Sequence, residues 1–143
     1  MKAQFTFRPI YKNTAPCIRI SSAKSSHVET LTQEKHTVDC DLDFNSVDTI
    51  KIEFLNKDDY DDNVVNIDKI ELDGINLQHF ILEGVYEPIY NQDWFDSQEV
   101  KPPLKFCPGT EMRHLGTWSY TITSPVWKHL MNCWLKDERH GNS

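Results

Sequence analysis

Apolar and acidic side chains alternate without a break from Val38 to Phe44. Successive side chains of a β-strand point to opposite faces, so this pattern predicts a strand with one face in a core and the other in water. The apolar side comprises Val38, Cys40, Leu42 and Phe44, and the solvent-facing side comprises Asp39, Asp41 and Asp43. The apolar face of a sheet that contains such a strand must be covered by a second layer. A second sheet provides that layer in a β-sandwich, which is therefore favoured.

The same alternation recurs in the segments that follow. Residues 50–54 alternate Ile, Ile and Phe with Lys and Glu, and residues 64–72 alternate in two stretches of opposite phase. The change of phase predicts a β-bulge near Asp68 or Lys69, because one extra residue returns the apolar side chains to the buried face. Asp73-Gly74 is a tight-turn pair, so residues 64–82 are predicted to form a β-hairpin.

Short strands are also predicted near the N-terminus and late in the chain. Residues 5–7 and 18–20 each carry an alternating apolar pair. The neighbouring Pro9 and Pro16 favour sheet edges or strand ends, because proline has no N–H to donate. Residues 118–122 alternate Trp, Tyr and Ile with Ser and Thr.

One helix is predicted near the C-terminus. Ser124-Pro125 is a helix-start pair, and the apolar residues that follow up to Leu135 recur at helical spacing. The predicted fold is therefore mainly β, a β-sandwich or jelly roll of short antiparallel strands with one short C-terminal helix. Its predicted core comprises Val38, Leu42, Phe44, Ile50, Ile52, Phe54, Val65, Ile67, Trp118, Tyr120 and Ile122.

The length of the chain predicts one domain. Its 143 residues match the usual span of a single domain, residues 1–143. Residues 84–116 are rich in proline and are predicted to form a long irregular loop, and residues 136–143 a polar tail. A loop this long in a small domain is usually functional or held by a partner.

Charge and hydropathy narrow the classes of partner. The chain has 22 acidic and 15 basic residues, a net charge of −7, and an acidic surface repels phosphate backbones. No apolar run is long enough for a signal peptide or a membrane span. We therefore expect no nucleic-acid or membrane partner, and synthesis in a cytoplasm.

The four cysteines are predicted to be reduced. Cys17, Cys40, Cys107 and Cys133 are widely spaced and contain no CxxC pair. In a reducing compartment such residues act as small buried apolar side chains, and disulfide pairing is the alternative.

An acidic cluster between two predicted strands is the candidate metal site. Its carboxylates, Asp58, Asp59, Asp61 and Asp62, are hard oxygen ligands of the kind that bind calcium. The segment is not an EF-hand, because it lacks glycine at the sixth position and glutamate at the twelfth. The simpler interpretation of the same residues is a solvated turn between strands, so we expect no cofactor, with calcium as the alternative.

Aromatic residues of the predicted loop are the candidate binding residues: Tyr86, Tyr90, Trp94 and Phe95. Exposed aromatic rings among acidic residues can stack on sugar rings or fill a pocket of a protein partner. Alternatively, these rings hold the loop against the sandwich. The sequence contains no GxSxG, no glycine-rich phosphate loop and no HExxH, so we predict that the protein is not an enzyme.

Two stretches together resemble known families. Residues 50–74, IKIEFLNKDDYDDNVVNIDKIELDG, resemble the strand–acidic loop–strand–glycine segment of calcium-dependent xylan-binding carbohydrate modules. Residues 116–135, GTWSYTITSPVWKHLMNCWL, complete a combination that resembles small virion structural proteins of contractile-tailed phages of marine cyanobacteria. The resemblance implies a carbohydrate-module-like β-sandwich.

The function that follows from this resemblance is structural. We expect a virion protein, made in the host cytoplasm, that decorates or connects parts of a phage particle (capsid, neck or tail). Its partners would be other virion proteins in a multi-copy assembly. The alternative is a calcium-dependent carbohydrate-binding module that binds a glycan on the host surface. A small enzyme is a third, weaker possibility.

Overall fold

The computed structural model describes residues 2–43, 47–56, 63–77, 84–90, 92–105, 111–113 and 115–123. Within these residues lie ten strands and one helix: β1 (Lys2–Ile10), β2 (Cys17–Ser21), β3 (Ser26–Thr30), β4 (His36–Asp41), β5 (Val47–Phe54), β6 (Val64–Leu72), β7 (Ile75–Asn76), β8 (Val85–Pro88), α2 (Gln92–Ser97), β9 (Glu111–Met112) and β10 (Gly116–Thr123).

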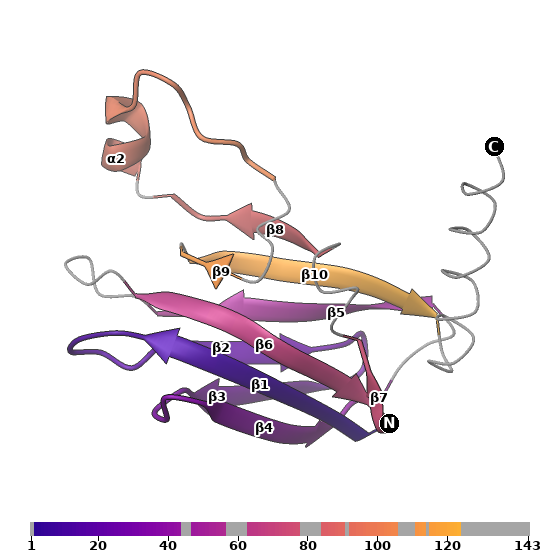
Figure 1. Ribbon diagram of the computed structural model, residues 1–143. Helices are drawn as coiled ribbons and strands as arrows, with labels where there is room; N and C mark the ends of the chain where they lie inside the picture. The colour runs from indigo at the N-terminus through magenta and orange to yellow at the C-terminus, as the bar shows by residue number, and fades with distance from the viewer. Residues whose placement is uncertain are drawn as a thin grey trace, which may run out of the picture.

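The strands form two antiparallel sheets. One has the order β4-β1-β6-β7, with β9 also paired to β6, and the other has the order β3-β2-β5-β10-β8. Figure 1 shows the two sheets stacked, with β1, β4 and β6 in front of β2, β3 and β5. The predicted β-sandwich is therefore confirmed.

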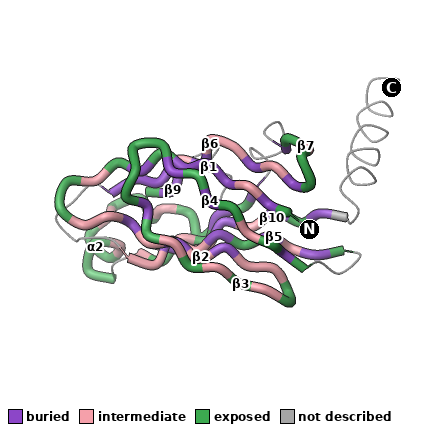
Figure 2. Tube along the Cα trace, turned by 90° about the horizontal axis from the view of Figure 1, so that it is seen from below, coloured by how far each residue is buried: buried purple, intermediate pink, exposed green. Residues whose placement is uncertain are grey.

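The core lies between the sheets and is built from the alternating faces of their strands. Every predicted core residue that the structure describes is buried, and Phe44 lies outside the described residues. Figure 2 shows the result along each strand, where buried residues alternate with half-buried or exposed ones. Phe5 and Phe7 of β1 add two stacked rings with centroids 6.2 Å apart. The period of two therefore identified the buried face of each long strand.

The predicted bulge is confirmed at Asp68. Thr6 of β1 pairs with Lys69, while the next residue, Phe7, pairs with Ile67, so Asp68 is the extra residue. Its carboxylate contacts Arg8 Nε at 3.4 Å and Lys35 Nζ at 3.9 Å. The bulge thus turns one acidic side chain toward two cations while the apolar residues on both sides stay in the core.

The β6–β7 hairpin turns at Asp73 and Gly74, whose φ angles are 49° and 79°. Two consecutive positive φ angles suit the right-handed twist of a two-residue hairpin. The second strand is shorter than predicted, because β7 ends at Asn76. Residues 78–83 of the predicted hairpin lie outside the described residues.

The two N-terminal strands are not sheet edges, contrary to the expectation from their prolines. β1 lies between β4 and β6, and β2 lies between β3 and β5. Pro9 is tolerated because pairing with β4 ends at Phe7, so at Pro9 only β6 lies alongside. Pro16 precedes β2, which leaves the strand-end part of the prediction correct.

The segment predicted as one irregular loop contains regular structure. Residues 84–116 include β8, the short helix α2 and β9. The predicted C-terminal helix and the polar tail lie outside the described residues, so the helix that the structure describes is α2 and not the one expected. Across the described part of the chain, no helix combines the length and hydropathy needed to cross a membrane.

Candidate binding surface

Tyr86 belongs to the core, which corrects its assignment as an exposed binding residue. It lies in β8 opposite Trp118 of β10, and its side chain is fully buried. Burial raises the pKa of the Tyr86 hydroxyl well above its usual range. The packing here is close, because a Cβ added to Gly84 would lie 2.0 Å from Nε1 of Trp118. Tyr86 therefore anchors the segment to the sandwich.

The other three candidate aromatics cluster on a segment that stands clear of both sheets. We call the described residues between 89 and 105 the projecting segment; it includes α2 and appears at the upper left of Figure 1. The Tyr90 ring lies 5.6 Å from the Trp94 ring and 5.6 Å from the Phe95 ring. The Tyr90 hydroxyl donates to the carbonyl of Pro103 at 2.7 Å. Tyr90 thus ties α2 to the returning chain, and partial burial raises the pKa of Tyr90.

The projecting segment is also ordered by hydrogen bonds at the C-terminal end of α2. Lys101 Nζ donates to the carbonyls of Phe95 at 2.8 Å and Asp96 at 2.9 Å, and lies 5.2 Å from the Phe95 ring centroid. Ser97 Oγ donates to the carbonyl of Trp94 at 2.7 Å. A cation is favourable at this end because the last carbonyls of a helix have no partner within it. These contacts connect the end of α2 to the chain that follows it.

Apolar side chains are nevertheless exposed on this segment. Four of the eight exposed large hydrophobic residues in the described chain lie on it: Ile89 (69% exposed), Trp94 (42%), Val100 (86%) and Leu104 (72%). Single exposed apolar residues are ordinary, whereas a group of them on one projecting feature indicates an interaction site.

The predicted calcium ligands Asp58, Asp59, Asp61 and Asp62 lie outside the described residues, so the metal stays a prediction. Within the described residues, no group of three or more His, Cys, Asp or Glu side chains is arranged to hold a metal. Asn63, which directly follows the acidic cluster, donates from Nδ2 to the Thr14 carbonyl at 3.0 Å. Its Oδ1 is buried and has no hydrogen-bond partner among the described residues, and a carbonyl oxygen is a ligand type that calcium accepts.

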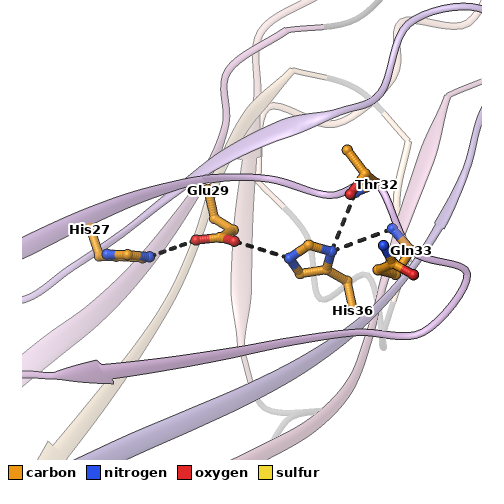
Figure 3. Close-up of polar contacts among 5 residues, drawn as sticks. All are labelled: His27, Glu29, Thr32, Gln33 and His36. Atoms are coloured by element: carbon orange, nitrogen blue, oxygen red, sulfur yellow. Dashed lines mark hydrogen bonds and ion pairs between the residues drawn. The ribbon is translucent and has the colours of Figure 1, made fainter.

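A cluster that the sequence did not reveal joins the edge strands of the two sheets (Figure 3). Glu29 of β3 contacts Nε2 of His27 at 2.8 Å and Nε2 of His36 at 3.1 Å, one through each carboxylate oxygen. Nδ1 of His36 accepts the N–H groups of Thr32 at 3.3 Å and Gln33 at 3.4 Å. Since Nδ1 is an acceptor, the His36 proton lies on Nε2 and is donated to Glu29.

Hydrogen bonds from His27 and His36 lower the pKa of Glu29 below its usual value. Both carboxylate oxygens and both nitrogens of His36 are already engaged, so the cluster links β3 to β4 as a structural brace. Only the spacing of His27 and Glu29 on one strand is visible in the sequence. His36 arrives from the opposite sheet, and no local pattern signals that contact.

The two described cysteines, Cys17 and Cys40, are free thiols, as predicted, while Cys107 and Cys133 lie outside the described residues. Cys40 lines a hollow of about 310 Å³ together with Lys2, Ala3, Asp39 and Asp41. Burial, followed by the charges of Asp41, Asp39 and Glu29, raises the pKa of Cys40 to about 11. The thiol is therefore protonated at neutral pH and is a poor nucleophile.

No protein-family model matches the chain, and no curated protein matches it. Among solved structures, the chain is similar to one titled "vCBM60 in complex with galactobiose", with a TM-score of 0.49 and 13% sequence identity. The match covers 84% of this chain and 97% of that chain.

Proposed function

We propose that the chain is a non-enzymatic structural protein of a phage particle that binds another protein of the particle through the projecting segment. The resemblance of residues 50–74 and 116–135 to small virion proteins supports the class. Such a protein would assemble with other particle proteins in the host cytoplasm, and each particle would contain many copies of it. The observation that carries the binding role is the grouping of Ile89, Trp94, Val100 and Leu104 as exposed apolar side chains on one segment.

The physical case for binding rests on preorganisation. Tyr90 and Lys101 fix the shape of the segment through the contacts described above, so docking loses less conformational entropy than ordering a flexible loop would. Tryptophan is among the residues that most often dominate the energy of an interface. An exposed Trp94 held against the Tyr90 ring, on a segment that also exposes aliphatic side chains, is therefore suited to fill a pocket on a protein.

The non-enzymatic part of the proposal has its own support. Glu29, the carboxylate that contacts two histidines, uses both oxygens in these hydrogen bonds and so serves to link two strands. The raised pKa of Cys40 makes that thiol a poor nucleophile at neutral pH.

A pair of matched variants tests the binding role. Val100→Ser removes an apolar side chain from the projecting segment, and Val47→Ser makes the same change at the far end of β5, where Val47 is 64% exposed. Each variant is expressed with the remaining particle proteins, and its copies in purified particles are counted by quantitative mass spectrometry. We expect Val100→Ser to lower incorporation several-fold and Val47→Ser to leave it unchanged. Equal incorporation of the two variants would contradict the proposed surface.

Carbohydrate binding is the second candidate function, and one observation favours it. The segment that carries the exposed ring of Trp94 also carries the exposed carboxylate of Asp93, and aromatic rings together with polar acceptors are the groups that bind sugars. In this case Trp94→Ala abolishes glycan binding on an array while incorporation into particles is unchanged. Added calcium should then raise the melting temperature and a chelator should lower it, because the metal would bind only the folded chain.

A further inference from the structure

We propose that the protein surface that binds the projecting segment is cationic and contributes arginine to the contact. This inference rests on the proposed function and names the chemistry of the partner. It follows from the charges that remain on the segment once its internal contacts are counted, and from the exposed indole ring that the same segment carries.

The two cations of the projecting segment are already engaged. Lys101 donates to the backbone carbonyls at the end of α2 and lies over the Phe95 ring. Lys105 pairs with Glu87 of β8, Nζ to Oε1, at 3.2 Å. Neither ammonium group is therefore available to attract an acidic partner without breaking a contact within the chain.

The carboxylates of the segment are not engaged in this way. Asp93, Asp96 and Glu99 are all exposed, and within the described part of the chain none of them takes part in an ion pair. The side chain of Asp96 accepts one hydrogen bond, from the neutral amide of Gln92 at 2.9 Å. The charge that the projecting segment presents to a partner is thus negative.

The combination of groups that the segment exposes, carboxylates and an aromatic ring, favours arginine over lysine. Asp93 and Asp96 are three residues apart in α2, so they lie on the same side of the helix, and Trp94 follows Asp93 directly. A guanidinium group can stack on an aromatic ring while its N–H groups donate to a carboxylate, whereas an ammonium group is a point charge. Arginine can therefore use both kinds of group that the segment exposes, the indole ring of Trp94 and a carboxylate.

The negative charge of the projecting segment also argues against two other kinds of binding partner. A second copy docked through the same segment about a two-fold axis would bring the same three carboxylates together. A nucleic acid or an anionic lipid surface would be repelled in the same way. The occupant that the charges favour is a basic protein surface with apolar side chains that cover Val100 and Leu104.

Short peptides provide a probe of this chemistry. The full chain, labelled with ¹⁵N, is titrated with a capped peptide of alternating leucine and arginine and, separately, with its leucine–glutamate counterpart. The readout is the shift of the Trp94 indole and of the amides of the projecting segment. The variant Asp93→Asn/Asp96→Asn/Glu99→Gln removes the three carboxylates. The control Glu34→Gln/Asp41→Asn/Asp43→Asn changes the net charge equally at three exposed carboxylates elsewhere.

We expect the arginine peptide to shift the signals of the projecting segment and the glutamate peptide to leave them unchanged. Loss of three exposed charge pairs should weaken binding of the arginine peptide by roughly tenfold in the first variant, with no such loss in the control. Equal weakening in both variants, equal binding of both peptides, or no shift with the arginine peptide would each overturn the proposal. Failure of the proposed function is a separate result, because it appears as equal incorporation of Val100→Ser and Val47→Ser into particles.

Discussion

Tyr86 and Tyr90 are four residues apart and have opposite roles. Tyr86 is fully buried in β8 opposite Trp118, whereas Tyr90 lies on the projecting segment, where its ring contacts those of Trp94 and Phe95. The sandwich uses apolar residues from distant parts of the chain and removes them from water. The projecting segment uses local hydrogen bonds to hold apolar residues in water. Similar side chains therefore provide stability in one region and a contact surface in the other.

The comparison predicts that stability depends on the sandwich. Phe54 lies in β5 between Ile18 of β2 and Gly116 of β10, and is almost fully buried. Phe54→Ala should lower the free energy of unfolding by about 2–5 kcal/mol, through lost burial and the cavity left behind. Urea unfolding followed by circular dichroism measures this change. A loss below about 1 kcal/mol would mean that the sandwich core is not the source of stability.

Substitutions at the junction between the two regions should cause the next largest loss of stability. A Cβ at Gly84 would overlap the indole of Trp118, the residue that also covers Tyr86. Gly84→Ala should therefore cost about 1–3 kcal/mol, as overpacking of a core does. The substitution Gly74→Ala is a control of another kind, because an added Cβ there meets no atom within 4 Å and only the positive φ of 79° resists it. If Gly84→Ala is neutral in thermal unfolding, the close packing of β8 on β10 is wrong.

The brace between β3 and β4 should contribute less, and its contribution should depend on pH. The pKa of Glu29 is lowered from its ordinary 4.5, so its contribution to stability is present above that value and is lost as the pH falls through the lowered pKa. Glu29→Gln should cost up to about 1 kcal/mol at neutral pH.

Thermal unfolding as a function of pH tests this expectation. The difference in melting temperature between the wild-type chain and Glu29→Gln should shrink as the pH falls below 4.5. Glu34→Gln, an exposed change in the turn that follows β3, should show no such trend. A difference that stays constant down to strongly acidic pH would show that the histidine contacts do not stabilise the fold.

The same comparison explains which features the sequence could predict. A strand with one solvent-exposed face alternates apolar and polar residues every two positions. This alternation predicted the buried faces of β4, β5 and β6 and the bulge at Asp68. Tyr86 was misassigned because β8 is only 4 residues long and ends at Pro88, too short for alternation to appear. The helix α2, with 6 residues, is likewise shorter than the helical period needs for detection.

Contacts between distant segments were the other features that the sequence did not predict. Alternation shows that a strand has a buried face, but not which sheet it joins, so the meeting of Glu29 with His36 had no local signal. The candidate aromatics were found by composition alone. Composition identified Tyr90, Trp94 and Phe95 but could not separate them from Tyr86, because that distinction depends on the pairing of β8 with β10.

Substitutions on the projecting segment should have the smallest effect on stability. Measuring that effect is the sharpest test of the comparison between the two regions. Trp94 is partly exposed and Val100 almost fully so. Substitutions at such positions remove little area from a core, so Val100→Ser should change the free energy of unfolding by less than about 0.5 kcal/mol. Trp94→Ala also loses the contact with the Tyr90 ring, yet the sandwich should unfold at nearly the same urea concentration as the wild-type chain.

Matched urea titrations followed by circular dichroism place the free energies of unfolding of three variants on one scale: Val100→Ser, Trp94→Ala and Phe54→Ala. The two changes on the projecting segment should lie near the wild-type chain and Phe54→Ala far from it. If Val100→Ser destabilises the chain as much as a core substitution does, its side chain is covered within the chain and is unavailable to a partner. The division between a stabilising sandwich and a binding segment would then be wrong, whatever the particle assay reports.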